Sequence, residues 1–187
     1  MQEQSGKGEQ LWFSHAIEAL FVRGLGARLT PEVKDRIVNK HGINLDRMPP
    51  AYPIRQVVEA CRSILPMLYP RLSEAEGFRQ LGVSFMQGYV ETLVGKAMVA
   101  VLKVIGPRRT LERMQKNFRT GGNYLETRFK VLGPTTCELW INDCTGMPTF
   151  YAGMIEEGAR MIGTRNLKTS LTPDTGPAWT MLVTWDV

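Results

Sequence analysis

Hydrophobic residues recur every three to four positions through the first two thirds of the chain, a spacing that predicts helices. The expected helices cover residues 10–25, 31–42, 54–68, 73–105 and 107–118. The fourth is the longest: it begins at a capping box formed by Ser73 and Glu76, and Gly106-Pro107 stops it. Because few of its positions are polar, it predicts a central helix surrounded on most sides.

After Tyr124 the hydrophobic period changes from helical to alternating, which is typical of half-buried strands. The pattern predicts strands over residues 124–131, 135–143, 167–171 and 179–187, with one helix over residues 148–162 between the second and third strands. Helices and strands are segregated along the chain, so we expect an α+β fold with a four-stranded antiparallel sheet built as β-β-α-β-β. We expect a flexible tail over residues 1–9 and one domain over residues 10–187.

The chain of 187 residues is 43% hydrophobic, enough for a sizeable core without disulfides. Its three cysteines are odd in number, which argues against a disulfide framework and favours a reducing compartment. The first ten residues lack the apolar region of a signal peptide, and the most apolar stretch, residues 83–105, contains several charged side chains. We therefore expect a cytoplasmic protein without a transmembrane segment.

Catalytic and metal-binding patterns are missing from the sequence. His15 and His41 are its two histidines, and the sequence contains no His-x-x-x-His, Cys-x-x-Cys or Glu-x-x-His pattern. There is no nucleophile elbow and no phosphate-binding loop. We expect a protein that is not an enzyme and needs neither a metal nor a cofactor. Nucleic-acid binding is not expected either, because no recognised module accompanies the basic residues.

The formal net charge of +5 arises locally, since residues 103–130 contain eight Lys or Arg residues against two acids. Arg109, Arg113 and Lys116 follow an i, i+4, i+7 spacing that predicts one positive face on the helix 107–118. Such a face could hold a nucleotide or a phospholipid headgroup. A simple solvated cationic face explains the pattern equally well.

Three segments carry a resemblance to a known family. The Phe-Met-x-Gly-Tyr-x-x-Thr run at residues 85–92, the hairpin ending in Trp140 and the run from Phe150 to Glu156 resemble a myxobacterial paralogous family of unknown function. More distantly, the order of the elements is similar to the vinyl-reductase-like sensor domains, the haem-NO-binding domains and the TRAPP-like subunits. The resemblance implies a module that binds a small hydrophobic molecule or a lipid tail, forms a homodimer and relays binding to a signalling partner.

The same resemblance argues against two groups that relatives hold. Haem-binding relatives need a histidine on the helix beside the cavity and a Tyr-x-Ser-x-Arg signature, and this sequence has neither. A zinc site like that of the vinyl-reductase-like members is not expected, because the last two predicted strands contain no cysteine.

We therefore expect a non-enzymatic sensory or regulatory domain with a hydrophobic pocket between the long helix and the sheet. The residues expected to line the pocket are Phe85, Met86, Tyr89, Leu93 and Trp140, with Phe150 and Tyr151 at its mouth. One alternative is a ligand-free interaction module that dimerises through the helix face bearing Gly88 and Gly95 or through the short helix around residues 33–38. Another is an anion binder that uses the basic helix.

Overall fold

The computed structural model describes residues 8–186, apart from the side chains of Val94 and Gln115. All but the last two residues of the tail predicted for residues 1–9 lie outside this range. The N-terminal elements are β1 (Leu11–Phe13), α1 (Ser14–Ile17), the π-helix η1 (Glu18–Gly24), the 3-10 helix η2 (Gly26–Arg28), α2 (Pro31–Asp35), the π-helix η3 (Arg36–Lys40), β2 (Ala51–Pro53) and α3 (Ile54–Leu68).

The prediction of a helix from residue 10 is wrong at its start, because residues 11–13 form a strand. β1 pairs antiparallel with β2, and Trp12 stands opposite Tyr52. Both aromatic side chains are buried while their strand neighbours are half-buried, which is the alternation of a strand with one face on the core. Tertiary packing of two aromatic residues thus overrides the helical spacing that continues from residue 14 onwards.

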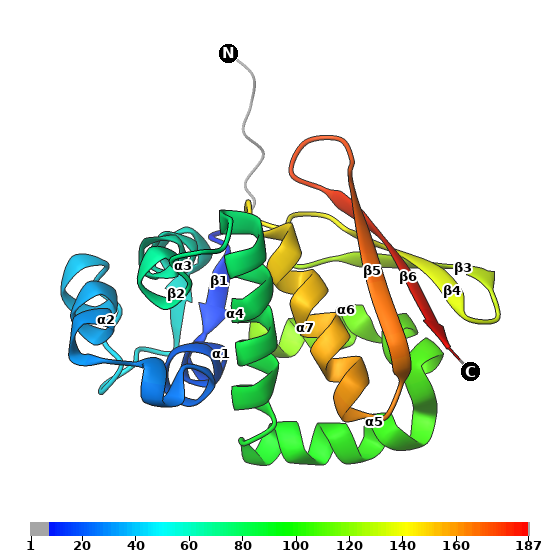
Figure 1. Ribbon diagram of the computed structural model, residues 1–187, viewed down its shortest axis with the longest axis horizontal. Coiled ribbons are helices and arrows are strands. Elements are labelled where there is room, and N and C mark those ends of the chain that lie inside the picture. Colours follow the sequence, from blue (N-terminus) through cyan, green and yellow to red (C-terminus); the bar gives the residue numbers. More distant parts are fainter. Residues whose placement is uncertain (1–7, 187) are drawn as a thin grey trace.

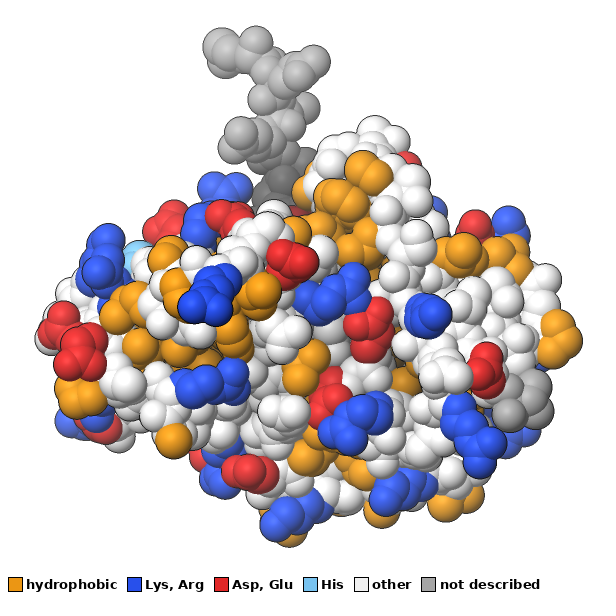
Figure 2. Space-filling model, in the orientation of Figure 1, with side chains coloured by type: hydrophobic (Ala, Val, Ile, Leu, Met, Phe, Trp, Pro, Cys, Tyr) orange, Lys and Arg blue, Asp and Glu red, His pale blue; other side chains and the backbone are white. Residues whose placement is uncertain are grey.

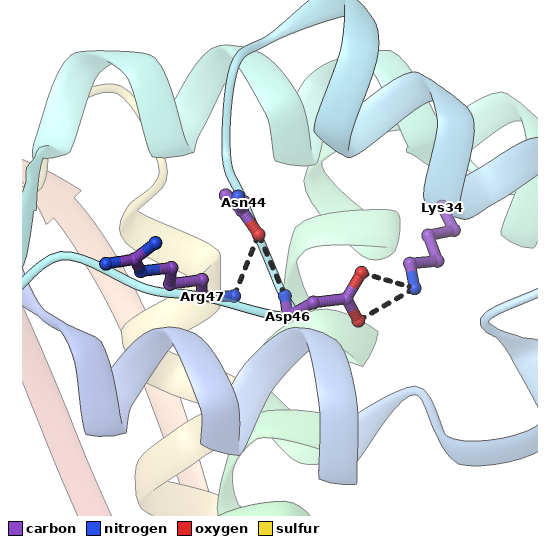
Figure 3. A network of polar contacts seen from close by, with 4 residues as sticks. All are labelled: Lys34, Asn44, Asp46 and Arg47. Atoms are coloured by element: carbon purple, nitrogen blue, oxygen red, sulfur yellow. Dashed lines mark hydrogen bonds and ion pairs between the residues drawn. The ribbon is translucent and has the colours of Figure 1, made fainter.

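The loop between η3 and β2 is held by a small polar network (Figure 3). The Asn44 side-chain oxygen accepts hydrogen bonds from the backbone amides of Asp46 and Arg47, at 3.0 and 2.8 Å. The Asp46 carboxylate in turn pairs with Lys34 of α2, at 2.9 and 3.0 Å. The first pair of contacts forms a local turn and the second attaches that turn to the helix.

The continuous helix predicted over residues 73–105 is instead two helices, α4 (Glu74–Tyr89) and α5 (Leu93–Glu112). Thr92 separates them, because its hydroxyl accepts the Gly95 amide hydrogen as an N-cap and donates to the Tyr89 carbonyl oxygen. The predicted stop at Gly106 is a kink within α5, where the glycine has a φ of 75° that L-residues rarely adopt.

The C-terminal half confirms the α+β prediction. Its elements are α6 (Met114–Gly121), β3 (Thr127–Gly133), β4 (Thr136–Ile141), α7 (Pro148–Met161), β5 (Arg165–Pro173) and β6 (Trp179–Asp186). The four strands form an antiparallel sheet in the order β3-β4-β6-β5, with α7 as the connection between its two hairpins. The predicted β-β-α-β-β arrangement is therefore correct.

Helix α7 lies between α4 and β5 (Figure 1). The two helices can approach closely because glycines stand where they meet. A Cβ on Gly82 of α4 would overlap the Phe150 carbonyl oxygen, and a Cβ on Gly153 of α7 would overlap the Arg79 carbonyl oxygen. Glu156 of α7 then joins three elements, since it pairs with Arg79 of α4 and accepts the backbone amide hydrogen of Thr169 of β5 at 3.1 Å. Glycine contacts and one carboxylate thus set the position of α7.

The surfaces proposed for dimerisation are used inside the chain. A side chain at Gly88 would overlap the Ala19 carbonyl oxygen of η1, and one at Gly95 would overlap that of Tyr89. Val33 and Ile37, on the short helical segment around residues 33–38, are buried in the core. Packing within the chain therefore covers Gly88 and the Val33 and Ile37 side chains, and dimerisation stays a prediction.

Candidate ligand cavity

A cavity of about 110 Å³ lies among α4, α5, α6 and α7. Trp12 of β1 and Ala16 of α1 line one side of it. Leu167 of β5 is the sheet's contribution to the lining. The pocket expected between the long helix and the sheet is thus displaced, because α7 covers the sheet and presents its other face to the cavity.

The space exists because small residues occupy one side of α7. Gly158 and Ala159 face the cavity, flanked along the same helix by Tyr151, Met154 and Ile155. Their spacing of three to four residues places them on one helical face. A Cβ on Gly158 would meet the Met86 side chain of α4 at 3.3 Å, so a larger residue there would press into the lining.

Aromatic rings form a connected wall of the cavity. The ring centroids of Trp12, Phe85 and Phe150 lie 5.6 to 5.8 Å from one another, and the rings are tilted. Tyr89 stacks on Phe85 at 5.8 Å, one helical turn further along α4. Tilted and offset aromatic pairs at such distances stabilise one another beyond the area that they bury, which holds this wall together.

The lining is almost entirely apolar, and none of the residues that line it in the described part of the chain is charged. Three of its hydroxyl groups have partners: Thr110 donates to the Gly106 carbonyl oxygen, Thr120 donates to that of Asn117, and Tyr151 shares a hydrogen bond with Tyr124. The Tyr89 hydroxyl differs from these, since it is buried and has no hydrogen-bond partner among the described residues.

The tyrosine pair behind the cavity is deeply buried. The oxygens of Tyr124 and Tyr151 are 2.9 Å apart. Loss of solvent raises the pKa of both phenols, because the charged phenolate is disfavoured in the interior. Both groups are therefore neutral in the physiological range and act as a structural hydrogen bond rather than as a base.

The structure brings together five of the seven residues predicted to bind a ligand: Phe85, Met86, Tyr89, Phe150 and Tyr151 all line the cavity. Phe150 and Tyr151 do not stand at a mouth, since both are fully buried within the wall. That these residues bind a ligand stays a prediction.

Leu93 and Trp140 lie away from the cavity. Leu93 is 85% exposed, because the helix breaks before it and α5 turns its first residue to solvent. In β4 the buried positions are Cys137, Leu139 and Ile141, so Trp140 faces the opposite side of the sheet. There its ring lies 4.4 Å from the Arg128 guanidinium carbon, and its indole nitrogen donates to Asp174 at 2.9 Å.

Sequence reasoning missed much of the lining, notably Trp12, Leu102 and Met154. Apolar residues 111, 114 and 118 follow a helical spacing in the sequence, and all three line the cavity. What the pattern did not contain was the direction of α5, which depends on the break at Thr92.

The single basic face predicted on helix 107–118 is wrong, because that helix is interrupted. Arg113 separates α5 from α6 with φ −93° and ψ 6°, so Arg109 and Lys116 belong to different helices. All three side chains are exposed. Figure 2 shows basic side chains interspersed with hydrophobic ones along the lower edge, where Figure 1 places α5. Anion binding at these residues stays a prediction.

The described part of the chain has neither a cluster of metal ligands nor a membrane-spanning helix. Within residues 8–186, no three or more His, Cys, Asp or Glu side chains gather in a way that could hold a metal ion. In the same range, no helix combines the length and the hydropathy needed to cross a membrane.

Solved structures of H-NOX proteins share this fold. An H-NOX protein from S. oneidensis in the Fe(II) ligation state, carrying three substitutions, superimposes with a TM-score of 0.74 at 9% identity, covering 94% of this chain and 96% of that one. The Fe(II)NO form gives 0.72 at 9% identity, with 94% and 99% covered. The unliganded Fe(II) H-NOX protein from K. algicida gives 0.66 at 9% identity, with 94% and 97% covered. At these identities the likeness concerns the fold alone.

Haem does not fit the residues present. A cavity of ~150 Å³ is filled by a single benzene ring, whereas a porphyrin has four pyrrole rings; the cavity here is about 110 Å³. No histidine or cysteine is among the described lining residues, and no basic side chain stands there to meet carboxylates of a porphyrin. The pocket is shaped for something much smaller than haem.

Family comparison covers nearly the whole chain. No curated protein matches it. The family model described as "Protein of unknown function (DUF2378)" matches residues 10–186, from before β1 through the end of β6. The chain therefore belongs to the DUF2378 family.

Proposed function

We propose that this chain is a non-enzymatic sensory or regulatory domain that binds a small hydrophobic molecule in the cavity among α4, α5, α6 and α7. The observation that carries the proposal is the cavity itself, which is apolar, uncharged and walled by aromatic rings in contact. The fold shared with H-NOX proteins, whose structures are described in Fe(II) and Fe(II)NO ligation states, supports a role in holding a small molecule.

The energetics favour an apolar occupant. Each Å² of apolar surface taken from water contributes roughly 25 cal/mol, and the wall is already in place. An engineered apolar cavity of ~150 Å³ in another protein binds benzene or xenon. A cavity of about 110 Å³ suits a molecule of similar or smaller size, or the end of a lipid tail.

Ligand binding would act on α5. Met98 and Leu102 of this helix reach the cavity, while Val101 and Val104 are exposed on its other side. The helix is bounded by the break at Thr92 and kinked at Gly106, two points where its direction can change with little cost to the rest of the fold. A ligand that moves α5 would thus alter a surface visible to a signalling partner.

The finer parts of the proposal rest on sequence resemblance. These are the myxobacterial source, the vinyl-reductase-like and TRAPP-like relationships, and assembly into a homodimer. Native mass spectrometry of the protein purified from cells measures the last directly and also reveals any ligand retained from the cell.

The binding test uses benzene as the probe and methionine methyl groups as reporters. Met86, Met98, Met114 and Met154 line the cavity, whereas Met67 is exposed elsewhere on α3. In spectra of protein labelled at the methionine methyl carbon, we expect saturable shifts for the cavity methionines and none for Met67. Absence of any saturable shift in the folded protein contradicts the proposal.

A pair of variants localises the binding. Ala159→Leu adds three carbon atoms to the cavity wall and should weaken benzene binding at least tenfold. Ala97→Leu makes the same change at an exposed position of α5 outside the lining and should leave binding unchanged. Equal affinities for both variants would place the probe somewhere other than this cavity.

A further inference from the structure

We propose that the outward face of α5 docks on the surface of an anionic lipid bilayer. Its aliphatic side chains enter the headgroup layer, and the lysines beside them pair with lipid phosphates and carboxylates. The basis is the juxtaposition of an exposed aliphatic stripe with basic side chains that have no ion pair among the described residues. The inference needs no ligand in the cavity, so it stands independently of the proposed function.

The aliphatic stripe lies on the outward side of α5. Leu93 is 85% exposed, Val101 54% and Val104 86%. Ala97 and Ala100 are exposed between them, and the spacing of three to four residues places all five on one side of the helix. The opposite side of α5 lines the cavity. A helix that is apolar on both sides is normally buried, so the exposed stripe indicates a surface that meets an apolar partner.

Basic residues accompany the stripe. Lys96 and Lys103 are exposed and seven residues apart, so both lie along the same flank of the helix. Residues 93–116 contain six Lys or Arg residues against one acid, Glu112, which pairs with Arg108 at 3.4 Å. Long lysine side chains can keep their ammonium groups at the lipid phosphates while the aliphatic residues lie deeper. The charge of this surface is therefore complementary to an anionic leaflet.

The position of α5 suits a flat partner. In Figure 1 the helix runs along the lower edge of the molecule, past the ends of α4 and α7, and Figure 2 shows basic and hydrophobic side chains mixed along that edge. A helix with an apolar stripe and lysines beside it binds in the plane of a membrane surface, with its apolar side in the headgroup region.

Two other occupants suit this face less well. Two copies of the chain would bring the lysines of α5 toward each other, and residues 93–104 contain no acid to balance them. Protein interfaces gain much of their affinity from Trp, Tyr or Arg side chains at their centre. The stripe contains only Leu, Val and Ala.

Vesicle sedimentation tests the role of charge. The wild type should bind vesicles of equal parts phosphatidylcholine and phosphatidylserine, bind phosphatidylcholine vesicles far more weakly, and lose affinity as salt is added. The pair Lys96→Gln and Lys103→Gln should weaken binding about 25-fold, since each basic residue at such a surface contributes about five-fold. The matched pair Lys40→Gln and Arg55→Gln removes the same charge at exposed positions of η3 and α3 and should leave binding nearly unchanged.

The role of the stripe is tested separately. The pair Val101→Gln and Val104→Gln keeps the charge and should weaken vesicle binding about ten-fold or more, because apolar surface is lost. A polarity-sensitive dye on Val104→Cys should shift its emission when vesicles bind, whereas the same dye on Ser170→Cys of β5 should not. The native cysteines are buried, so the dye reacts with the new thiol. Because all these positions are exposed, the variants should melt at the wild-type temperature.

The outcomes that overturn the inference are distinct. A wild-type protein that ignores phosphatidylserine vesicles leaves the face of α5 for a protein partner. Equal losses in both charge pairs would show attraction to net charge rather than to α5, and an unshifted dye at position 104 would show that the stripe does not enter the bilayer. A dimer in solution that the valine pair dissociates would assign the stripe to a second copy. None of these results bears on the cavity, because benzene binding is measured without vesicles.

Discussion

The hydroxyl groups of Tyr124 and Tyr151 meet 2.9 Å apart in the interior, directly behind the cavity wall. Tyr124 precedes the sheet and Tyr151 lies in the first turn of α7, so one hydrogen bond joins the segment before the sheet to the helix that connects its two hairpins. The Phe118 ring of α6 meets the Tyr151 ring edge to face at a centroid distance of 5.6 Å, which extends this junction to the helices below the cavity.

Replacing one member of this pair should cost more than replacing both. Tyr124→Phe leaves the Tyr151 hydroxyl unsatisfied, and we expect the free energy of unfolding to fall by about 1–3 kcal/mol. The double Phe variant should recover part of that loss, because no polar group is then stranded. Denaturant unfolding of the four proteins in a double-mutant cycle measures the coupling, and additive losses would contradict a direct hydrogen bond.

Alkaline pH should destabilise the protein through the same two residues. Burial raises the pKa of Tyr124 and of Tyr151 above the value of ~10 for a free tyrosine. At a pH between the tyrosine pKa of the unfolded chain and that of the folded chain, the unfolded chain has lost protons that the folded chain keeps. The free energy of unfolding is therefore unaffected by these groups below pH ~10 and declines above it. Unfolding midpoints measured from pH 8 to 11 test this, and the decline should be shallower in the double Phe variant.

Gly88→Ala should destabilise the fold although alanine favours helices. The added methyl group would overlap the Ala19 carbonyl oxygen of η1, and overpacking of this kind costs about 1–3 kcal/mol.

Gly121→Ala is the matched control for this substitution. Gly121 lies in α6, and the atom nearest to a Cβ at this position is 3.7 Å away, so the alanine fits. The free energy of unfolding should therefore rise by up to about 1 kcal/mol. Chemical denaturation of both variants gives the comparison, and equal stabilities would show that η1 and α4 do not pack as closely as described.

The three cysteines should be unreactive in the folded protein. Burial raises the pKa of Cys61 and Cys144 to about 12 and that of Cys137 to about 11, so little thiolate forms near neutral pH. We expect no reaction with a disulfide reagent at pH 8 until guanidinium is added, after which three thiols react. Ser170→Cys, at an exposed position of β5, supplies a thiol that reacts at once. Rapid labelling of a native thiol would reveal an opening of the core.

Local patterns predicted most elements because they depend on neighbours in the chain. Alternation in residues 136–141 and the spacing in α7 identified a strand and a helix with their buried faces, and Gly106-Pro107 marked a real kink. The errors fall where distant contacts decide. Residues 11–13 are a strand because β2 pairs with them, and residues 90–92 break a helix that hydropathy alone would continue.

The candidate site divides in the same way. Phe85, Met86 and Tyr89 share one face of α4. Phe150 and Tyr151 lie in the first turn of α7, which is largely buried. The inward direction of these side chains therefore follows from helical periodicity. Leu93 and Trp140 were misplaced because one lies beyond a helix break and the other on the far face of a strand.

By itself the sequence determined the α+β class, the order β-β-α-β-β and the apolar faces of α4 and α7, since each follows from the local repeat of side-chain directions. The tertiary structure alone decided that α5 runs past the ends of α4 and α7, that a cavity remains among these helices, and that the Tyr89 hydroxyl has no partner among the described residues. These depend on where separate elements come to rest against one another, and periodicity along a chain carries no information about the distance between two faces.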